Sequence, residues 1–392
     1  MRNKFTKSIY LVFFFSFFSE LVFSQVVTGA EQPEKYLPLL QGKKVGVIAN
    51  HTAVIGNTHL VDSLLKLGVK IIKVYSPEHG FRGTANAGEK VNDQRDEATG
   101  LPIVSLYGKN KKPTAEQIKD IDVLVFDIQD VGVRFYTYIS TMTYCMEAAA
   151  ESNKEIIVLD RPNPNGHFVD GPILEKEYAS FIGLHEVPIA HGMTVGEYAQ
   201  MVNGEGWLSN GIKCNLSVIA CNNYSHTTKY NLPIKPSPNL PNMSSVYLYP
   251  SVCLFEGTAI SVGRGTDKPF QVIGHPDLKS DKYSFTPKPN DGAKEPKLNG
   301  KLCYGFDLSN FGEVIMPDYG KIYLFWLINV YNEFPDKKNF FTSSFNLLAG
   351  NDKLKQQIIS GKTEAEIRNS WQDGLKSFKQ VRKKYLLYND FE

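Results

Sequence analysis

Short apolar segments alternate with helical ones through the first half of the chain, and this alternation constrains the fold more than any other feature. The strand segments are continuously apolar, as expected of parallel strands covered by helices on both faces. Strands are predicted at residues 44–49, 69–75, 103–107, 123–128 and 156–159, and helices at 59–67, 114–121 and 139–152. The sequence therefore predicts an α/β fold whose N-terminal domain holds a doubly wound, Rossmann-like parallel sheet.

The second half of the chain is less regular. Three prolines within residues 235–241 exclude a helix or a central strand, so this segment is either a domain linker or a rigid wall of a cleft. Residues 276–300 are rich in Pro, Lys and Asp and are predicted to form an exposed loop. We expect an N-terminal domain over residues 43–249 and a smaller α+β domain over residues 250–392.

Helices are also predicted in this half. The segment 194–203 has the pattern of a capped helix, and residues 319–334 are strongly apolar, with Asp318 placed to cap them. Residues 352–385 are predicted to be mostly helical.

Residues 1–24 have the layout of a secretory signal peptide. Arg2, Lys4 and Lys7 precede the apolar run 9–18, and the small residue Ser24 stands at the expected cleavage position. The run is shorter than the roughly 20 apolar residues of a membrane-spanning helix. We therefore expect a protein secreted to the periplasm or the cell exterior, with no membrane span once the signal is removed.

Charge and cysteine content exclude two further classes. Forty-three Lys and Arg against 41 Asp and Glu leave a net charge of +2, so the chain lacks the basic field of a nucleic-acid binder. The five cysteines are odd in number and match no disulfide-rich scaffold. Cys214 and Cys221 flank a predicted strand at 215–220, and we expect most of the five to be buried and unpaired.

Polar residues cluster where the predicted strands end, which is the edge at which doubly wound sheets bind ligands. The turn after the first strand lacks the glycines of a dinucleotide fingerprint, and no phosphate-binding loop occurs, so NAD and ATP sites are disfavoured. The polar residues at these four strand ends are Asn50 and His51; Glu78, His79 and Arg82; Asp127, Gln129, Asp130 and Arg134; and Arg161 with Asn163.

Four motifs together resemble the NamZ-type exo-β-N-acetylmuramidases, over about residues 43–390. They are Pro77-Glu78-His79-Gly80-Phe81-Arg82-Gly83, the segment from Asp127 to Tyr138, Asp160-Arg161-Pro162-Asn163-Pro164, and Glu256-Gly257-Thr258 with Gly263-Arg264-Gly265-Thr266. The resemblance implies a Rossmann-like domain, a smaller C-terminal domain and an active site between them. It also implies an exo-acting glycoside hydrolase that releases N-acetylmuramic acid from the non-reducing end of peptidoglycan fragments in cell-wall turnover, without a cofactor.

Glycoside hydrolysis usually needs two carboxyl groups, and three are candidates. Glu78 follows a buried strand, where desolvation favours the protonated acid; pairing with Arg82 is its structural alternative. Glu256 would enter the cleft from the second domain, or else pair with Arg264. Asp127 ends a buried strand, where it could also cap the following turn.

The remaining candidates are expected to bind the sugar. The lactyl carboxylate of muramic acid matches a guanidinium, so Arg134, Arg161 and Arg264 are specificity candidates. Tyr136, with Phe135 and Tyr138, could stack on sugar or belong to the core. Asn50, His51 and Asn163 could bind hydroxyls, and His79, Arg82, Gln129 and Asp130 complete the expected substrate-binding set.

Other functions stay open on sequence grounds. The histidines at 51, 79, 191 and 275 have no metal-motif spacing, and no Gly-x-Ser-x-Gly elbow occurs, so no metal site and no serine nucleophile are expected. The alternatives are a metal-assisted amidase or deacetylase acting on cell-wall fragments, and a non-catalytic cell-wall sugar-binding protein. Oligomeric state is not predicted.

Overall fold

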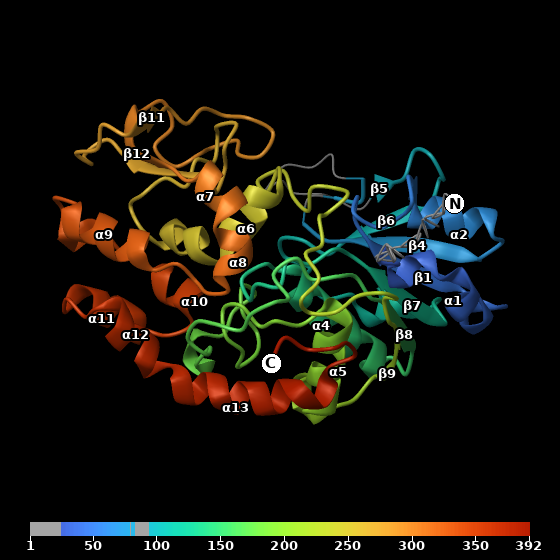
Figure 1. Cartoon of the computed structure of the whole chain (residues 1–392). Helices are drawn as coiled ribbons and strands as arrows, with labels where there is room; N and C mark the ends of the chain where they lie inside the picture. The colour runs from blue at the N-terminus through green and yellow to red at the C-terminus, as the bar shows by residue number, and fades with distance from the viewer. Residues whose placement is uncertain (1–24, 79, 83–93) are drawn as a thin grey trace, which may run out of the picture.

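The computed structural model describes residues 25–78, 80–82 and 94–392. A seven-stranded sheet with flanking helices forms the N-terminal half, and helices with a three-stranded sheet form the C-terminal half (Figure 1). The expected signal peptide and His79 lie outside the described residues.

The elements alternate through the first half of the chain, as predicted. The strands are β1 (Val45–Ala49), β2 (Val54–Ile55), β3 (Thr58–His59), β4 (Ile71–Ser76), β5 (Gln94–Arg95), β6 (Pro102–Ser105), β7 (Val123–Asp127), β8 (Glu155–Leu159), β9 (Asn215–Ile219), β10 (Val272–His275), β11 (Tyr283–Phe285) and β12 (Cys303–Asp307). The helices are α1 (Pro33–Leu40), α2 (Leu60–Lys66), α3 (Ala115–Ile118), α4 (Tyr138–Glu151), α5 (Val195–Gly204), α6 (Met243–Val252), α7 (Ser309–Val314), α8 (Met316–Tyr319), α9 (Phe325–Glu333), α10 (Phe345–Ala349), α11 (Lys353–Ile359), α12 (Glu364–Ser370) and α13 (Gln372–Arg382).

The large sheet has the strand order β5-β6-β4-β1-β7-β8-β9, and all its strands are parallel except β5. The parallel part, β6-β4-β1-β7-β8-β9, has the strand order of Rossmann dinucleotide-binding domains. The predicted α/β class and doubly wound sheet are therefore confirmed, although the glycine fingerprint of those domains is absent.

Apolar side chains cover both faces of this sheet, which explains why the strands are apolar throughout. On β1, Ile48 packs into the core that includes α4 and α5, while Val45 and Val47 pack against α1 and α2 on the other face. The Thr194 hydroxyl accepts from the Glu197 amide and so caps α5. Each helix is thus held by an apolar stripe on the sheet.

The second half departs from the predictions in two places. The single helix expected at 319–334 is wrong, because Gly320, with φ of 63°, ends α8 and the next helix begins only at Phe325. Asp318 therefore lies inside α8 and caps nothing there. Residues 276–300 are not wholly exposed: they include β11 and the buried side chain of Phe285.

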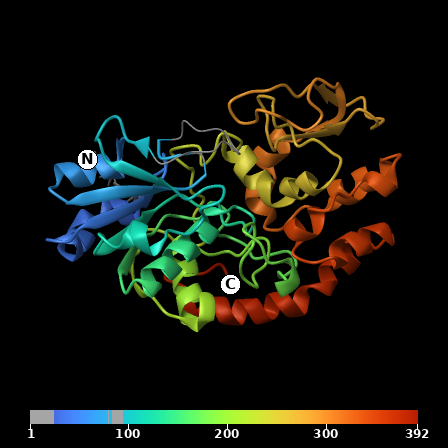
Figure 2. The same cartoon turned by 180° about the vertical axis from the view of Figure 1, so that it is seen from behind.

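The two halves share one hydrophobic core. A single cluster of buried residues runs from Ile48 and Phe126 of the sheet to Phe345 and Phe378 of the C-terminal helices. Helix α6 crosses the boundary expected at residue 250. Helix α13 runs back beneath α4 and α5, and the chain ends near the middle of the molecule (Figures 1 and 2).

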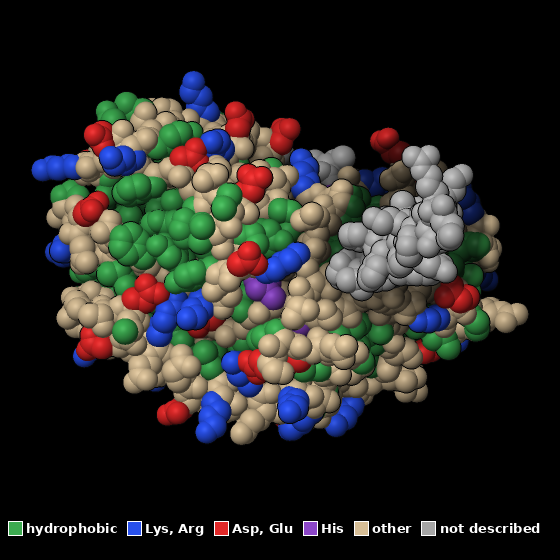
Figure 3. All heavy atoms as spheres, viewed as in Figure 1, with side chains coloured by type: hydrophobic (Ala, Val, Ile, Leu, Met, Phe, Trp, Pro, Cys, Tyr) green, Lys and Arg blue, Asp and Glu red, His purple; other side chains and the backbone are tan. Residues whose placement is uncertain are grey.

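The cysteines follow the prediction, because all five are buried and unpaired. Within the described residues, no helix is long and apolar enough to cross a membrane. Hydrophobic side chains gather on the C-terminal part of the surface in the region of α9 (Figure 3), where Phe325 is one of the exposed apolar residues.

Candidate active site

A cavity of about 200 Å³ lies where the two halves meet. Six residues singled out in the sequence line it: Glu78, Phe135, Tyr136, Tyr138, Glu256 and Arg264. Glu78 follows the carboxyl end of β4, whereas Glu256 lies in the 3-10 turn Cys253–Gly257 that continues α6. Two acidic residues from separate parts of the chain are thereby brought to one cavity.

Glu78 interacts electrostatically with a neighbouring phenol. Burial, and then the negative charge of Glu78, raise the pKa of Tyr138 above its ordinary value. The Tyr138 ring makes an edge-on contact with Tyr136, with 4.9 Å between the ring centroids. Tyr138 therefore stays a neutral phenol beside Glu78 at physiological pH.

Glu256 is paired with Arg264. The Arg264 Nε donates to a Glu256 carboxylate oxygen at 2.9 Å, and the two side chains are 30% and 28% exposed. Burial by itself would lower the pKa of Arg264, but the charge of Glu256, the neighbouring Tyr249 and Cys253 and the hydrogen bond to Glu256 together raise it. The pair lies at the cavity wall, which confirms the contact named as the alternative role of Glu256.

Aromatic rings form much of the remaining wall. Tyr249 makes edge-on contacts with Phe135 and Phe270, at centroid distances of 5.5 and 5.0 Å. The Arg264 guanidinium lies over the Phe270 ring, 5.0 Å from its centroid. Phe270 has a φ of 56°, a strained backbone conformation for a non-glycine residue of the kind that concentrates at functional sites.

The proline-rich segment is a wall of the cavity rather than a linker. Ser237, Asn239 and Leu240 line the cavity. The segment is fastened to the N-terminal half because the Tyr136 hydroxyl donates to the Pro236 carbonyl at 2.8 Å. The Nε2 atom of the His51 ring lies 2.9 Å from the Lys235 carbonyl oxygen, within hydrogen-bond distance. Burial lowers the pKa of His51.

Asp127 lies outside the cavity, in a buried ion pair. Its carboxylate accepts two hydrogen bonds from Arg161, of 2.5 and 2.8 Å, and the Asp127 side chain is 0% exposed. Arg161 also donates to the Val54 carbonyl. Both residues, expected in catalysis and in substrate binding, are instead occupied with each other at the sheet edge.

Arg134 also makes its hydrogen bonds within the protein, to backbone carbonyls. The fully buried guanidinium donates to the carbonyls of Pro172 and Val187 and, more than 200 residues along the chain, to those of Leu348 and Ala349. Burial lowers the pKa of Arg134 to about 9. This arginine ties the C-terminal part to the sheet domain and does not line the cavity.

The other polar candidates hold loops in place. Asn163 donates to the Met193 carbonyl, Gln129 to the Pro162 carbonyl, and Asp130 accepts from the Gly132 amide at 2.6 Å. All three side chains are buried. They shape the strand-end loops beneath the cavity instead of lining it.

Two further candidates lie at the same edge of the sheet. Asn50 is buried and accepts from the amide and hydroxyl of Thr52. Arg82 makes four hydrogen bonds to Asp62 and Asp96, and these contacts raise its pKa and lower that of Asp96 to about 2. Arg82 is thus occupied by two carboxylates other than Glu78.

Sequence reasoning missed Tyr249, Phe270, Asn239 and Cys253, which also line the cavity. Neither helix α6, which carries Tyr249, nor the 3-10 turn that begins at Cys253 was predicted, so these two residues had no structural context. No group of three or more His, Cys, Asp or Glu side chains that could hold a metal ion occurs within residues 25–78, 80–82 and 94–392.

Comparison with known proteins places the whole fold in one family. Models of the exo-β-N-acetylmuramidase NamZ match residues 45–244 (N-terminal part) and 247–388 (C-terminal part). The chain is 42% identical over 385 residues to the peptidoglycan β-N-acetylmuramidase NamZ of Bacillus subtilis (strain 168), covering 90% of this chain and 89% of that protein.

Two crystal structures of DUF1343 family proteins from Bacteroides fragilis are similar throughout. The first has a TM-score of 0.88 at 48% identity and covers 94% of this chain and 100% of its own. The second has a TM-score of 0.80 at 32% identity and covers 93% and 99%. The chain therefore belongs to the NamZ family of exo-β-N-acetylmuramidases.

Proposed function

We propose that the protein is an exo-acting glycoside hydrolase that releases N-acetylmuramic acid from the non-reducing end of peptidoglycan fragments. The convergence of Glu78 and Glu256 on one cavity carries this proposal, since glycosidases use two carboxyl groups flanking the scissile bond. Membership of a muramidase family supports it. Residues 1–24 read as a signal peptide, so we also propose that the enzyme acts outside the cytoplasm.

The cavity suits a single terminal sugar. Its volume of about 200 Å³ lies below the range of sites for larger ligands, in line with removal of one residue from a chain end. The rings of Tyr136, Tyr249 and Phe270 offer apolar faces to the C–H groups of a pyranose. A mid-chain cut of a long glycan would need a more extended groove.

The two carboxyl groups have different surroundings, which suggests different roles. We propose Glu78 as the general acid that protonates the leaving oxygen, because Glu256, the other glutamate that lines the cavity, is ion-paired with Arg264. Glu256, whose charge Arg264 compensates, acts as the carboxylate that assists attack at the anomeric carbon.

Arg264 is the proposed determinant of muramic acid specificity. Of the three candidate arginines, Arg134 and Arg161 are buried and occupied, whereas Arg264 lines the cavity. Among the described residues its hydrogen bond to Glu256 uses Nε, which leaves the two terminal nitrogens to face the lactyl carboxylate.

The test compares hydrolysis of chromogenic β-N-acetylmuramide and β-N-acetylglucosaminide substrates. Wild-type enzyme should prefer the muramide in kcat/KM, and Arg264→Met should lower that preference by about tenfold or more, the effect of losing a charged hydrogen-bonding partner. The ratio cancels any general loss caused by disturbing Glu256. Equal preference in the two proteins would exclude Arg264 as the specificity residue, and no cleavage of either substrate by wild type would contradict the proposed function.

A further inference from the structure

Lys297 binds the backbone of the turn that carries Glu256. Its ammonium donates to the carbonyls of Thr258, Glu256, Ile260 and Phe255, at 2.7, 3.2, 3.2 and 3.4 Å. An ammonium has three N–H donors, so these four oxygens share them and surround the nitrogen. A single side chain thus fixes the backbone on both sides of Glu256.

The same segment of chain also supports the loop that carries Arg264. The Lys288 amide donates to the Gly265 carbonyl at 2.9 Å. Gly265 has a φ of 80°, and a Cβ atom there would lie 2.5 Å from the Lys288 carbonyl oxygen and 2.7 Å from Pro296. This close approach permits only glycine, so residues 288–297 contact both sides of the Glu256–Arg264 pair.

A third contact joins this segment to the opposite wall of the cavity. Asn239, which lines the cavity from the proline-rich segment, donates to the Gly292 carbonyl at 2.7 Å. Leu298, next to Lys297, has a φ of 60°, a strained conformation that the surrounding contacts must maintain. Contacts with both walls of the cavity therefore fix the backbone of residues 288–298, although the sequence predicts an exposed loop there.

Charge adds to these contacts. Burial lowers the pKa of Lys297, the charge of Glu256 opposes that change, and Arg264 contributes to it. The Lys297 ammonium thus lies close enough to interact electrostatically with both Glu256 and Arg264. Removing it would take the donor from the carbonyls of Thr258, Glu256 and Ile260 and a positive charge from beside Glu256, whereas the Phe255 carbonyl would keep the amide and hydroxyl of Thr258.

We propose that Lys297 is a positioning residue that holds Glu256 and Arg264 in their working arrangement through the carbonyl oxygens around Glu256. This inference rests on the proposed function, in which Glu256 assists hydrolysis. Lys297 itself does not line the cavity within the described residues, so it acts through the turn and not on the sugar.

The test measures kcat and KM for a chromogenic β-N-acetylmuramide with Lys297→Ala and with Lys301→Ala, a matched change at an exposed lysine of the same segment. Lys297→Ala should lower kcat about 10²-fold and change KM less than about threefold, because a misplaced catalytic carboxylate affects the transition state more than binding. Lys301→Ala should stay within about twofold of wild type. A kcat of Lys297→Ala above about a third of the wild-type value would overturn the proposal.

Chemical rescue separates positioning from a general structural role. n-Propylammonium matches the atoms that Lys297→Ala removes, and it should raise kcat of this variant by about tenfold, whereas tetramethylammonium, which has no N–H donor, should not. Rescue by neither ion, or by both equally, would overturn the proposal. If Lys297→Ala does not fold, Lys297→Gln replaces it, and a kcat within about threefold of wild type would overturn the proposal in the same way.

A measurement without turnover distinguishes failure of this inference from failure of the proposed function. n-Propylammonium should raise the Tm of Lys297→Ala and leave the Tm of wild type, whose own lysine fills the site, unchanged. A wild-type enzyme inactive on muramides contradicts the proposed function alone. An unchanged Tm of Lys297→Ala contradicts the ammonium site around Glu256, whatever the activity.

Discussion

Asp130 is a buried carboxyl group at the edge of the large sheet, and its pKa is unusually high. One oxygen accepts from the Gly132 amide at 2.6 Å, while Oδ1 has no hydrogen-bond partner within the described residues. Burial raises the pKa of Asp130 to about 7. In the folded protein this group therefore takes up a proton at a pH where the unfolded chain, with an ordinary aspartate, has lost it.

The sign of the resulting pH dependence follows from linkage. Because the folded pKa is the higher one, this group's contribution to stability is complete below about pH 4 and is lost as the pH rises to about 7. Asparagine does not titrate, so Asp130→Asn should lack this loss of stability. The free energy of unfolding of the variant minus that of wild type should therefore be larger at pH 8 than at pH 5, by an amount on the order of a few kcal/mol. Urea unfolding at both pH values measures it.

Asp281→Asn, at an exposed aspartate, is the matched control and should show the same difference from wild type at both pH values. A stability difference for Asp130→Asn that is equal at pH 5 and pH 8 would contradict the buried, protonated state.

For single residues, the sequence shows which chemical groups are present but not which of them are buried. Arg134 lies between Val133 and Phe135, and Arg264 lies between Gly263 and Gly265, and neither sequence context shows whether the guanidinium is buried. They differ because Leu348 and Ala349, far along the chain, supply carbonyls that bury Arg134, whereas the Arg264 side chain stays 30% exposed among the described residues. Only the tertiary fold brings those carbonyls in, so no local pattern could separate a structural arginine from a cavity arginine.

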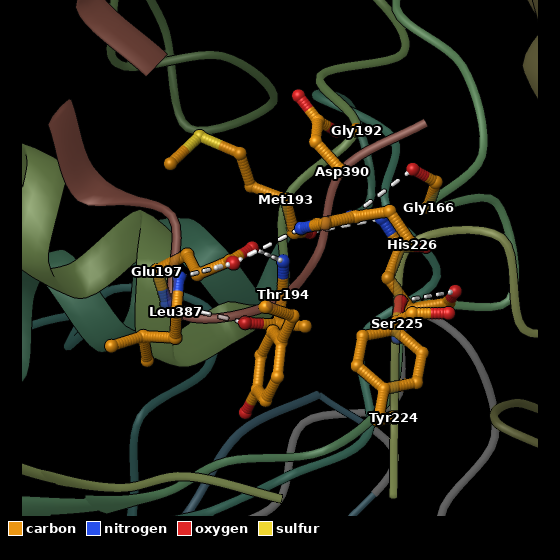
Figure 4. Close-up of polar contacts among 12 residues, drawn as sticks. Gly166, Gly192, Met193, Thr194, Glu197, Tyr224, Ser225, His226, Leu387 and Asp390 are labelled. Atoms are coloured by element: carbon orange, nitrogen blue, oxygen red, sulfur yellow. Dashed lines mark hydrogen bonds and ion pairs between the residues drawn. The ribbon is translucent and has the colours of Figure 1, made fainter. Parts of the chain in front are cut away.

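Among the elements, the C-terminal segment after α13 fastens the two halves together. The Leu387 amide donates to Glu197, whose carboxylate also contacts the buried His226 ring at 3.0 Å (Figure 4). The Tyr388 hydroxyl donates to Asp160 at 2.5 Å and accepts from the Cys221 amide at 2.8 Å. The segment thus satisfies two buried carboxylates at the ends of β8 and α5.

Tyr388→Phe should therefore lower the free energy of unfolding by about 1–3 kcal/mol, because it leaves a buried amide and a buried carboxylate short of a partner. Tyr385→Phe is the control, since that hydroxyl donates to the partly exposed Glu205, and the substitution should lower the free energy of unfolding by about 1 kcal/mol or less. Chemical denaturation compares the two. Equal losses would mean that the Tyr388 contacts add nothing to stability.

Helices and strands were predictable where the sequence has a regular pattern of buried apolar residues, and they were missed where it has no such pattern. The inner strands of the large sheet share one requirement, burial on both faces, and β1, β4, β7 and β8 were located within a few residues. The short edge strand β5 was not predicted. The break between α8 and α9 depends on one left-handed glycine, Gly320, inside an otherwise apolar stretch. The support given by residues 288–298 comes from contacts with distant turns, which periodicity does not encode.

In the whole molecule, a shared core joins the sheet domain to the C-terminal part. Buried side chains from β7, α4, α6, α9 and α13 belong to one cluster, and α6 spans the point where the two family models meet. The cavity lies at this junction, so its two glutamates keep their relation only while both parts stay docked. Stability and site geometry are coupled for that reason.

A continuous core should unfold as one unit. We expect a single calorimetric transition whose van't Hoff and calorimetric enthalpies agree. Two separated transitions, or loss of activity well before loss of the sheet, would show instead that the C-terminal part undocks by itself.

The most direct test of the central claim is hydrolysis of the peptide-free disaccharide N-acetylmuramyl-β-1,4-N-acetylglucosamine by wild type and Glu78→Gln, followed by mass spectrometry. We expect wild type to release equal amounts of the two monosaccharides, and Glu78→Gln to be slower by a factor of about 10² or more, the usual share of general acid catalysis. Intact disaccharide after incubation with folded wild type, or a Glu78→Gln rate above about a tenth of the wild-type rate, would contradict a muramidase that uses Glu78 as its acid.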